Sequence, residues 1–120
     1  MNVLFVCTEN IARSPMSEAL FRELLGHDTR HRARAVGTAS HALRRLTTRD
    51  LAWADVVAAM EETHRLVIRT RWPDHAHKVV VLDVPDHFGP GDPELRETVA
   101  PKIRALVGEL DARARAVPKP

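Results

Sequence analysis

The feature that most constrains the fold is a passage from an apolar strand to a helix start at the beginning of the chain. Residues 2–6 form a largely apolar run that leads into Cys7, the only cysteine of the sequence. Five residues separate Cys7 from Arg13, and Ser14-Pro15 follows at once. Serine followed by proline is a common N-cap and first helical position. The segment therefore predicts a strand, a tight loop and a helix in immediate succession.

A loop of this kind is suited to hold a tetrahedral oxyanion. Its backbone N–H groups and the N-terminus of the following helix attract an anion, and Arg13 can donate two parallel hydrogen bonds to two of its oxygens. The same positive field favours the thiolate form of Cys7, which can attack phosphorus without a histidine base. The Ser14 hydroxyl can donate to this sulfur when it leaves. A buried strand-end cysteine and an ordinary helix cap are the structural alternative.

Length and composition indicate a single globular domain, which we expect to span residues 1–116, with 117–120 as a frayed tail. No apolar stretch approaches the length of a membrane span. A lone cysteine excludes an internal disulfide framework and fits the reducing cytoplasm, where we expect the protein to act. The net charge is only +2. We expect no cofactor, no metal, no nucleic acid partner and no membrane association.

Strand-like apolar runs alternate with helical patterns along the chain. The expected strands are residues 2–6, 33–36, 55–60 and 78–82, and the expected helices are residues 14–25, 47–53, 61–72 and a last one from Asp92-Pro93. Such alternation predicts an α/β fold, a three-layer α/β/α arrangement with a four-stranded parallel sheet and a phosphate-binding loop after the first strand. The run 78–82 is continuously apolar, which is typical of a central strand. Pro101 should kink or split the last helix.

A second loop, rich in aspartate, follows the expected strand 78–82. In parallel sheets the loops at the carboxyl ends of strands form one crevice, so this loop should face Cys7. Cleavage of a phosphate ester needs a general acid for the leaving oxygen. Asp92 fits a helix N-cap, and Asp83 lies at the strand end, where it is expected to cap the turn. Asp86 lies in the middle of the loop without a local structural role. We therefore predict that Asp86, rather than Asp83 or Asp92, is the general acid.

These motifs resemble the low-molecular-weight protein tyrosine phosphatase family, in a short form, over nearly the whole chain. The resemblance is carried by residues 3–7, Asn10-Ile11, Arg13-Ser14-Pro15, Glu18-Ala19, Gly37-Thr38, residues 53–60 and, in the place of the family's acidic Asp-Pro-Tyr-Tyr-Gly loop, residues 85–89.

The resemblance implies a phosphomonoester hydrolase that works through a phosphocysteine on Cys7. Arg13 would clamp the phosphoryl group, and Asp86 would act as acid and then as base. Asn10 would shape the loop in a left-handed conformation, and Ser14 would donate to the thiolate. The ligands would be a phosphotyrosine protein or small aryl phosphate, inorganic phosphate and other oxyanions. The expected substrate-binding residues are Thr8, Glu9, Asn10, Ile11, Ala12, Arg13, Ser14 and Phe88, whose ring would stack on an aromatic leaving group.

The sequence also departs from the family pattern. Glu9 stands where the family usually has glycine, so its side chain should strain a left-handed position and repel a dianion. Ala12 replaces a second cysteine, which removes a protective disulfide. His87-Phe88 replaces the paired tyrosines, and the stretch 37–53 is short, which reduces the rim of the pocket.

Two other functions remain open from the sequence. The first is arsenate reduction, for which an external thiol would be needed because the chain has no further cysteine. The second is a non-catalytic oxyanion-binding module in which Glu9 has abolished turnover. The pairs His75/His77 and His27/His31 lack a matching ligand spacing, and we predict surface histidines rather than metal ligands. His64 is predicted to be a surface or packing residue within its helix.

Overall fold

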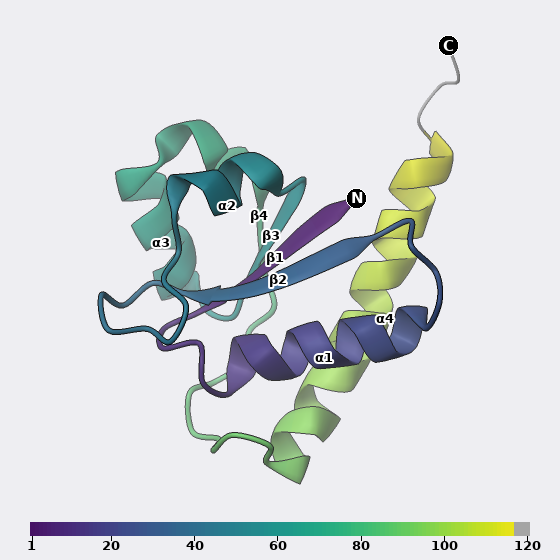
Figure 1. Cartoon of the computed structure of the whole chain (residues 1–120), viewed down its shortest axis with the longest axis horizontal. Coiled ribbons are helices and arrows are strands. Elements are labelled where there is room, and N and C mark those ends of the chain that lie inside the picture. The colour runs from purple at the N-terminus through teal and green to yellow at the C-terminus, as the bar shows by residue number, and fades with distance from the viewer. Residues whose placement is uncertain (117–120) are drawn as a thin grey trace.

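The sheet of this protein has four strands, all parallel, in the order β2-β1-β3-β4 (Figure 1). The computed structural model describes residues 1–116. The strands are β1 (Asn2–Cys7), β2 (Arg32–Gly37), β3 (Val56–Ala59) and β4 (Val79–Val81). The predicted α/β fold is confirmed. The single-domain extent stays a prediction, and the predicted frayed tail lies outside the described residues.

Helices cover both faces of the sheet and give three layers (Figure 1). Alternate residues of β1 point to opposite faces. Phe5 packs with α1 and α4 in one core, whereas Leu4 packs with α2 and α3 in the other. None of the helices within residues 1–116 is long and apolar enough to cross a membrane. The helices are α1 (Arg13–Leu25), α2 (Thr48–Trp53), α3 (Glu62–Arg71), the short 3-10 helix η1 (Pro73–Lys78) and α4 (Pro93–Ala116).

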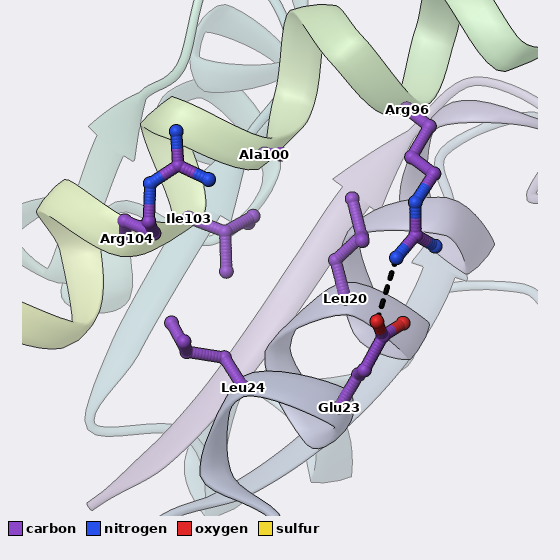
Figure 2. A pocket seen from close by; sticks show the side chains of 7 residues that line it. All are labelled: Leu20, Glu23, Leu24, Arg96, Ala100, Ile103 and Arg104. Atoms are coloured by element: carbon purple, nitrogen blue, oxygen red, sulfur yellow. Dashed lines mark hydrogen bonds and ion pairs between the residues drawn. The ribbon is translucent and has the colours of Figure 1, made fainter.

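The helix that follows the cysteine loop is anchored by α4. Leu20 of α1 and Ile103 of α4 are both buried, and they face a shallow groove of about 280 Å³ between the two helices (Figure 2). Arg96 of α4 donates to Glu23 of α1 at 2.6 Å along the rim of this groove. The position of the α1 N-terminus, and of the loop before it, is thus fixed against the longest helix.

The structure bears on three sequence predictions about these elements. β4 is an edge strand, and its run is apolar because Val79 and Val80 pack into the two different cores. Of the kink or split predicted at Pro101, the split does not occur, because α4 is continuous from Pro93 to Ala116. Proline removes only one helical N–H, and the buried residues on either side hold the helix to the sheet. α1 begins at Arg13, so Ser14 is inside the helix and is not its N-cap.

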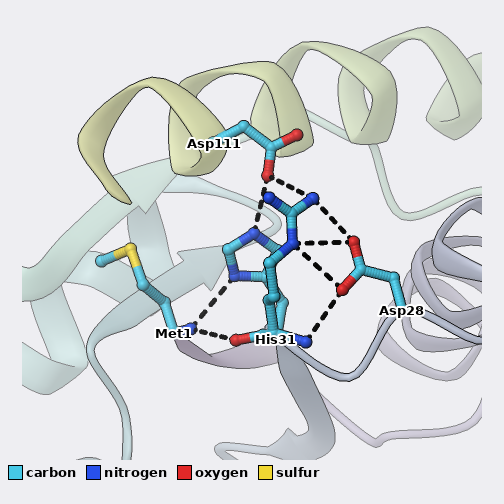
Figure 3. Close-up of polar contacts among 5 residues, drawn as sticks. Met1, Asp28, His31 and Asp111 are labelled. Atoms are coloured by element: carbon cyan, nitrogen blue, oxygen red, sulfur yellow. Dashed lines mark hydrogen bonds and ion pairs between the residues drawn. The ribbon is translucent and has the colours of Figure 1, made fainter. Parts of the chain in front are cut away.

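One predicted surface histidine is buried in a polar cluster at the opposite end of β1 from the cysteine (Figure 3). His31 contacts the amino group of Met1 through Nδ1 at 3.0 Å and Asp111 of α4 through Nε2 at 2.8 Å. The hydrogen bond from His31 and the charge of the nearby Arg30 hold the pKa of Asp111 below its usual value. The ring therefore joins the first strand to the last helix.

Candidate active site

The loop between β1 and α1 surrounds the sulfur of Cys7 with polar groups. Cys7 is 3% exposed. Its Sγ accepts from the Asn10 N–H at 3.2 Å and lies 3.0 Å from the Ser14 hydroxyl. Asn10 has φ 57°, the left-handed conformation expected of it, and asparagine tolerates this region better than most residues. Ser14 also donates to the Asn10 side-chain oxygen at 2.8 Å, so the three residues form one buried network.

The carbonyl groups of the loop point away from the site and toward the segment 38–43, which binds them. Backbone N–H groups of this segment donate to the carbonyls of Cys7, Thr8 and Glu9 at 2.9, 2.9 and 3.0 Å. A trans peptide places the following N–H opposite to its carbonyl. The N–H groups of Thr8, Glu9 and Asn10 are therefore turned toward the interior of the loop. Hydrogen bonds far from the sulfur thus build the anion cradle that the spacing predicted.

This packing requires glycine at position 37. A Cβ atom there would lie 2.5 Å from the carbonyl oxygen of Thr8 and 3.0 Å from the backbone nitrogen of Asn10. Both are backbone atoms of the loop, so neither can shift to make room for a Cβ atom without moving the cradle.

We therefore expect Gly37→Ala to weaken inorganic phosphate binding and turnover by up to about 10²-fold, because it displaces the cradle. Gly108→Ala is the matched control, since a Cβ at this exposed helical position meets nothing within 4 Å. It should raise the free energy of unfolding by about 0.5–1 kcal/mol and leave phosphate binding unchanged. Phosphate titrations and urea unfolding measure both effects. Equal phosphate affinities in Gly37→Ala and the wild-type chain would contradict the prediction.

Arg13 is buried and contacts three other segments. Its Nη1 donates to the Val84 carbonyl at 2.9 Å and lies 3.2 Å from the Glu61 carboxylate. Its Nη2 lies 3.6 Å from Asp86 and 3.4 Å from the Thr8 hydroxyl. Sequence reasoning missed Glu61. The signal for it was an acidic residue shortly after the third predicted strand, at the same end of the sheet as Cys7.

His64 is the second residue whose place beside the cysteine loop was not predicted from the sequence. It is 2% exposed. Its Nδ1 accepts from the Glu61 N–H at 3.0 Å, and its Nε2 lies 2.9 Å from the Thr8 hydroxyl. Burial, followed by the neighbouring Arg13 cation, lowers the pKa of His64 to about 4, while Glu61 and Asp86 oppose this shift. His64 is therefore neutral and joins α3 to the cysteine loop.

The low pKa of His64 predicts a specific pH dependence of stability. The unfolded chain binds a proton on this residue below about pH 6.5, whereas the folded chain does so only below about pH 4. Stability is therefore full above pH 6.5 and falls by roughly 3 kcal/mol as the pH drops to 4. Urea unfolding at pH 7, 5.5 and 4.5 should show this loss in the wild-type chain and a smaller one in His64→Asn. Parallel pH profiles for the two proteins would refute it.

The three aspartates of the acid loop have different surroundings. Asp86 lines the cavity that contains Cys7. Asp92 accepts from the N–H of Glu94 at 2.9 Å and so caps α4 as predicted. Asp83 is exposed and left-handed, with φ 56°. Within residues 1–116, only Asp86 of the three belongs to this cavity.

The cavity above Cys7 has a volume of about 160 Å³. Its lining brings together most of the predicted site residues and adds Pro90, whereas Asn10 and Ser14 lie behind the loop and support it. The rings of His87 and Phe88 contact each other, with centroids 4.1 Å apart. The lining residues are Cys7, Thr8, Glu9, Ile11, Ala12, Arg13, Asp86, Phe88 and Pro90.

Glu9 does not strain the loop, contrary to the prediction from the sequence. The non-glycine residues with positive φ in the described part of the chain are Asn10 and Asp83. The left-handed position is thus Asn10, and Glu9 needs no glycine-like backbone. Glu9 is one of the residues that line the cavity, its side chain is half-exposed, and its carboxylate lies 4.0 Å from Nε2 of His41.

A buried cysteine in an anion cradle, on a parallel α/β sheet and opposite a carboxylate, defines a cysteine-based phosphatase. The family model of the low molecular weight phosphotyrosine protein phosphatases matches residues 2–41 of this chain.

Similarity to individual phosphatases extends over nearly the whole chain. It is 28% identical to a protein-arginine-phosphatase of Bacillus subtilis (strain 168), over 92% of this chain and 94% of that protein. The solution structure of a low molecular weight protein tyrosine phosphatase from Bacillus subtilis is 25% identical, with a TM-score of 0.79 over 93% of this chain and 98% of that one. A cysteine-to-serine mutant of the YwlE arginine phosphatase, with a phosphorylated active-site serine, is 27% identical, with a TM-score of 0.82 over 92% and 96%.

Proposed function

We propose that this chain hydrolyses aryl phosphates, phosphotyrosine among them, through a phosphocysteine on Cys7. The observation that carries the proposal is the position of Cys7 at the base of a ring of inward N–H groups, with Arg13 and Asp86 lining the same cavity. We place the activity in the cytoplasm, because a free thiol persists in a reducing compartment.

In the first step Cys7 Sγ attacks phosphorus and the bond from phosphorus to the leaving oxygen breaks. Asp86, in its protonated form, gives its proton to that oxygen. Arg13 and the loop N–H groups hold the three remaining oxygens, over which the negative charge of the transferred group is spread in the transition state. Glu61 and Asp86 hold the two terminal nitrogens of Arg13, so the guanidinium group is already fixed in position beside the cavity.

In the second step the Asp86 carboxylate takes a proton from water, and the water oxygen attacks phosphorus. The bond between sulfur and phosphorus breaks, and inorganic phosphate leaves. The departing thiolate has no hydrogen to donate, so the Ser14 hydroxyl, 3.0 Å away, becomes the donor in their contact by turning its single hydrogen from the Asn10 side-chain oxygen to the sulfur. The Asn10 N–H at 3.2 Å supplies the second hydrogen bond.

The apolar part of the cavity wall favours an aromatic substrate. Ile11 is 47% exposed although it is apolar, and Phe88 and Pro90 line the cavity with it. A phenyl ring that enters between these side chains removes apolar surface from water and can stack on Phe88.

Phosphoarginine is the second candidate substrate, and a specific observation favours it. Glu9 is one of the residues that line the cavity, and its negative charge at the rim would attract a cationic guanidinium and repel a dianionic aryl phosphate. The similarity to arginine phosphatases supports the same candidate.

A matched pair of peptides, identical except for phosphotyrosine or phosphoarginine, tests the substrate class. We expect kcat/KM for phosphotyrosine to be higher by at least about tenfold. Glu9→Gln should raise it further for phosphotyrosine and lower it for phosphoarginine, because the substitution removes the negative charge at the rim. A preference for phosphoarginine that Glu9→Gln abolishes would assign the second substrate instead. Turnover only of arsenate with an added thiol, or none at all, would support the other functions that the sequence left open.

A further inference from the structure

A buried histidine from a different strand–helix connection touches the cysteine loop and has no role in the steps above. We infer that His64 is a positioning residue that orients the Thr8 hydroxyl so that it donates a hydrogen bond to the bound phosphoryl group. The inference rests on the proposed phosphate-binding function of the loop. It adds a side-chain donor to the backbone cradle and to Arg13.

The tautomer of His64 follows from its contacts. Nδ1 accepts from the backbone N–H of Glu61 at 3.0 Å, so Nδ1 carries no hydrogen. The only neutral tautomer consistent with this bond has its hydrogen on Nε2. Nε2 lies 2.9 Å from the Thr8 hydroxyl oxygen, and it must therefore be the donor of that bond.

The hydrogen of the Thr8 hydroxyl is then free to point into the cavity. Within residues 1–116, the two contacts of this oxygen are with donors, Nε2 of His64 at 2.9 Å and Nη2 of Arg13 at 3.4 Å. A hydroxyl has two acceptor positions and one donor position. Both acceptor positions face the protein, and Thr8 lines the cavity above Cys7. An anion oxygen in the cradle is the natural acceptor for the remaining hydrogen.

The connection between β3 and α3 therefore serves the cradle twice. Glu61 precedes the first residue of α3, and its carboxylate lies 3.2 Å from Nη1 of Arg13. Its helix then presents His64, which holds Thr8. Loss of the histidine would leave Thr8 free to rotate its hydroxyl toward other partners, and the anion would lose one oriented donor.

Two substitutions separate the two nitrogens of the ring. His64→Asn places an oxygen near the position of Nδ1, so it can keep the bond from the Glu61 N–H, but it cannot reach Thr8. His64→Gln is longer, and its amide N–H₂ can replace Nε2 as the donor to Thr8. Thr8→Val removes the hydroxyl at nearly constant volume. His27→Asn, at an exposed histidine, is the control.

The test is a double-mutant cycle on the dissociation constant of inorganic phosphate, measured by competitive inhibition and by calorimetry. Thr8→Val should weaken phosphate binding by about 10- to 100-fold, the effect of a lost hydrogen bond to a charged group. His64→Asn should weaken it by about threefold to tenfold, and His64→Gln by less than about threefold. In the Thr8→Val background, His64→Asn should raise the dissociation constant of phosphate by less than about twofold, because the hydroxyl that His64 orients is gone. His27→Asn should change nothing.

Equal effects of His64→Asn in the two backgrounds would overturn the inference, and so would a Thr8→Val variant that binds phosphate as tightly as the wild-type chain. Equal losses in His64→Gln and His64→Asn would also overturn it, since a merely structural histidine does not distinguish the two. If His64→Asn does not fold, Thr8→Val and His64→Gln carry the test, because the first should lose phosphate affinity and the second should keep it to within about threefold. A wild-type chain that binds no phosphate at all would refute the proposed function itself, whereas additivity in a chain that binds phosphate refutes only the role of His64.

Discussion

Cys7→Ser is expected to reduce turnover of p-nitrophenyl phosphate by at least about 10³-fold, as removal of a nucleophile does in other hydrolases. A serine hydroxyl is a weak nucleophile without a neighbouring base, and the hydrogen bonds around position 7 come from the Asn10 N–H and the Ser14 hydroxyl rather than from a base.

The same variant should fold and bind inorganic phosphate, because the cradle consists of backbone N–H groups and Arg13. Steady-state kinetics, thermal unfolding and phosphate titration measure the three properties separately. Activity of Cys7→Ser within about tenfold of the wild-type value would show that the sulfur is not the nucleophile.

Asp86→Ala is expected to reduce turnover by about 10²–10⁴-fold on phenyl phosphate or phosphotyrosine, because their leaving oxygens are basic and need a proton. The loss should be smaller on p-nitrophenyl phosphate, whose phenoxide leaves readily as an anion. Asp86 lines the cavity of Cys7 and lies 3.6 Å from Arg13, so its carboxyl group can reach the leaving oxygen. Alkylation of Cys7 by iodoacetate should proceed normally in the variant.

Asp92→Ala is the control for this prediction. Asp92 accepts from the Glu94 N–H at the start of α4, and its loss should cost about 1 kcal/mol of stability through the missing cap. The folded variant should keep most of its activity. An exchange of the two phenotypes would identify Asp92 as the acid.

The part of the site that follows from local sequence was predictable. The strand, the loop and α1 are contiguous, so the spacing of Cys7 and Arg13 was enough to predict a cradle, and the resemblance placed Asn10 in its left-handed position. The position of Asp92 before a proline likewise predicted a cap. In each case the residues that determine the conformation lie within a few positions of each other.

The remaining features depend on contacts between distant segments. Glu61 and His64 reach the loop only because β3 lies beside β1, and the alternation of strands and helices does not specify that order. The edge position of β4 was missed for the same reason, since an edge strand that is covered by helices on both faces is as apolar as a central one. Glu9 was misjudged because the family's glycine suggested a backbone requirement that Asn10 alone fulfils.

The outward carbonyls of the loop have a consequence for how such a site can diversify. The segment 38–43 holds the peptide planes of residues 7–9 in place through backbone atoms only, so the shape of the cradle does not depend on the side chains at positions 9 and 11. Those side chains are half-exposed at the rim, where they meet whatever carries the phosphate. In a chain built in this way, substitutions at the rim can change which class of phosphorylated residue is the substrate, while the catalytic residues at the base of the cavity stay the same.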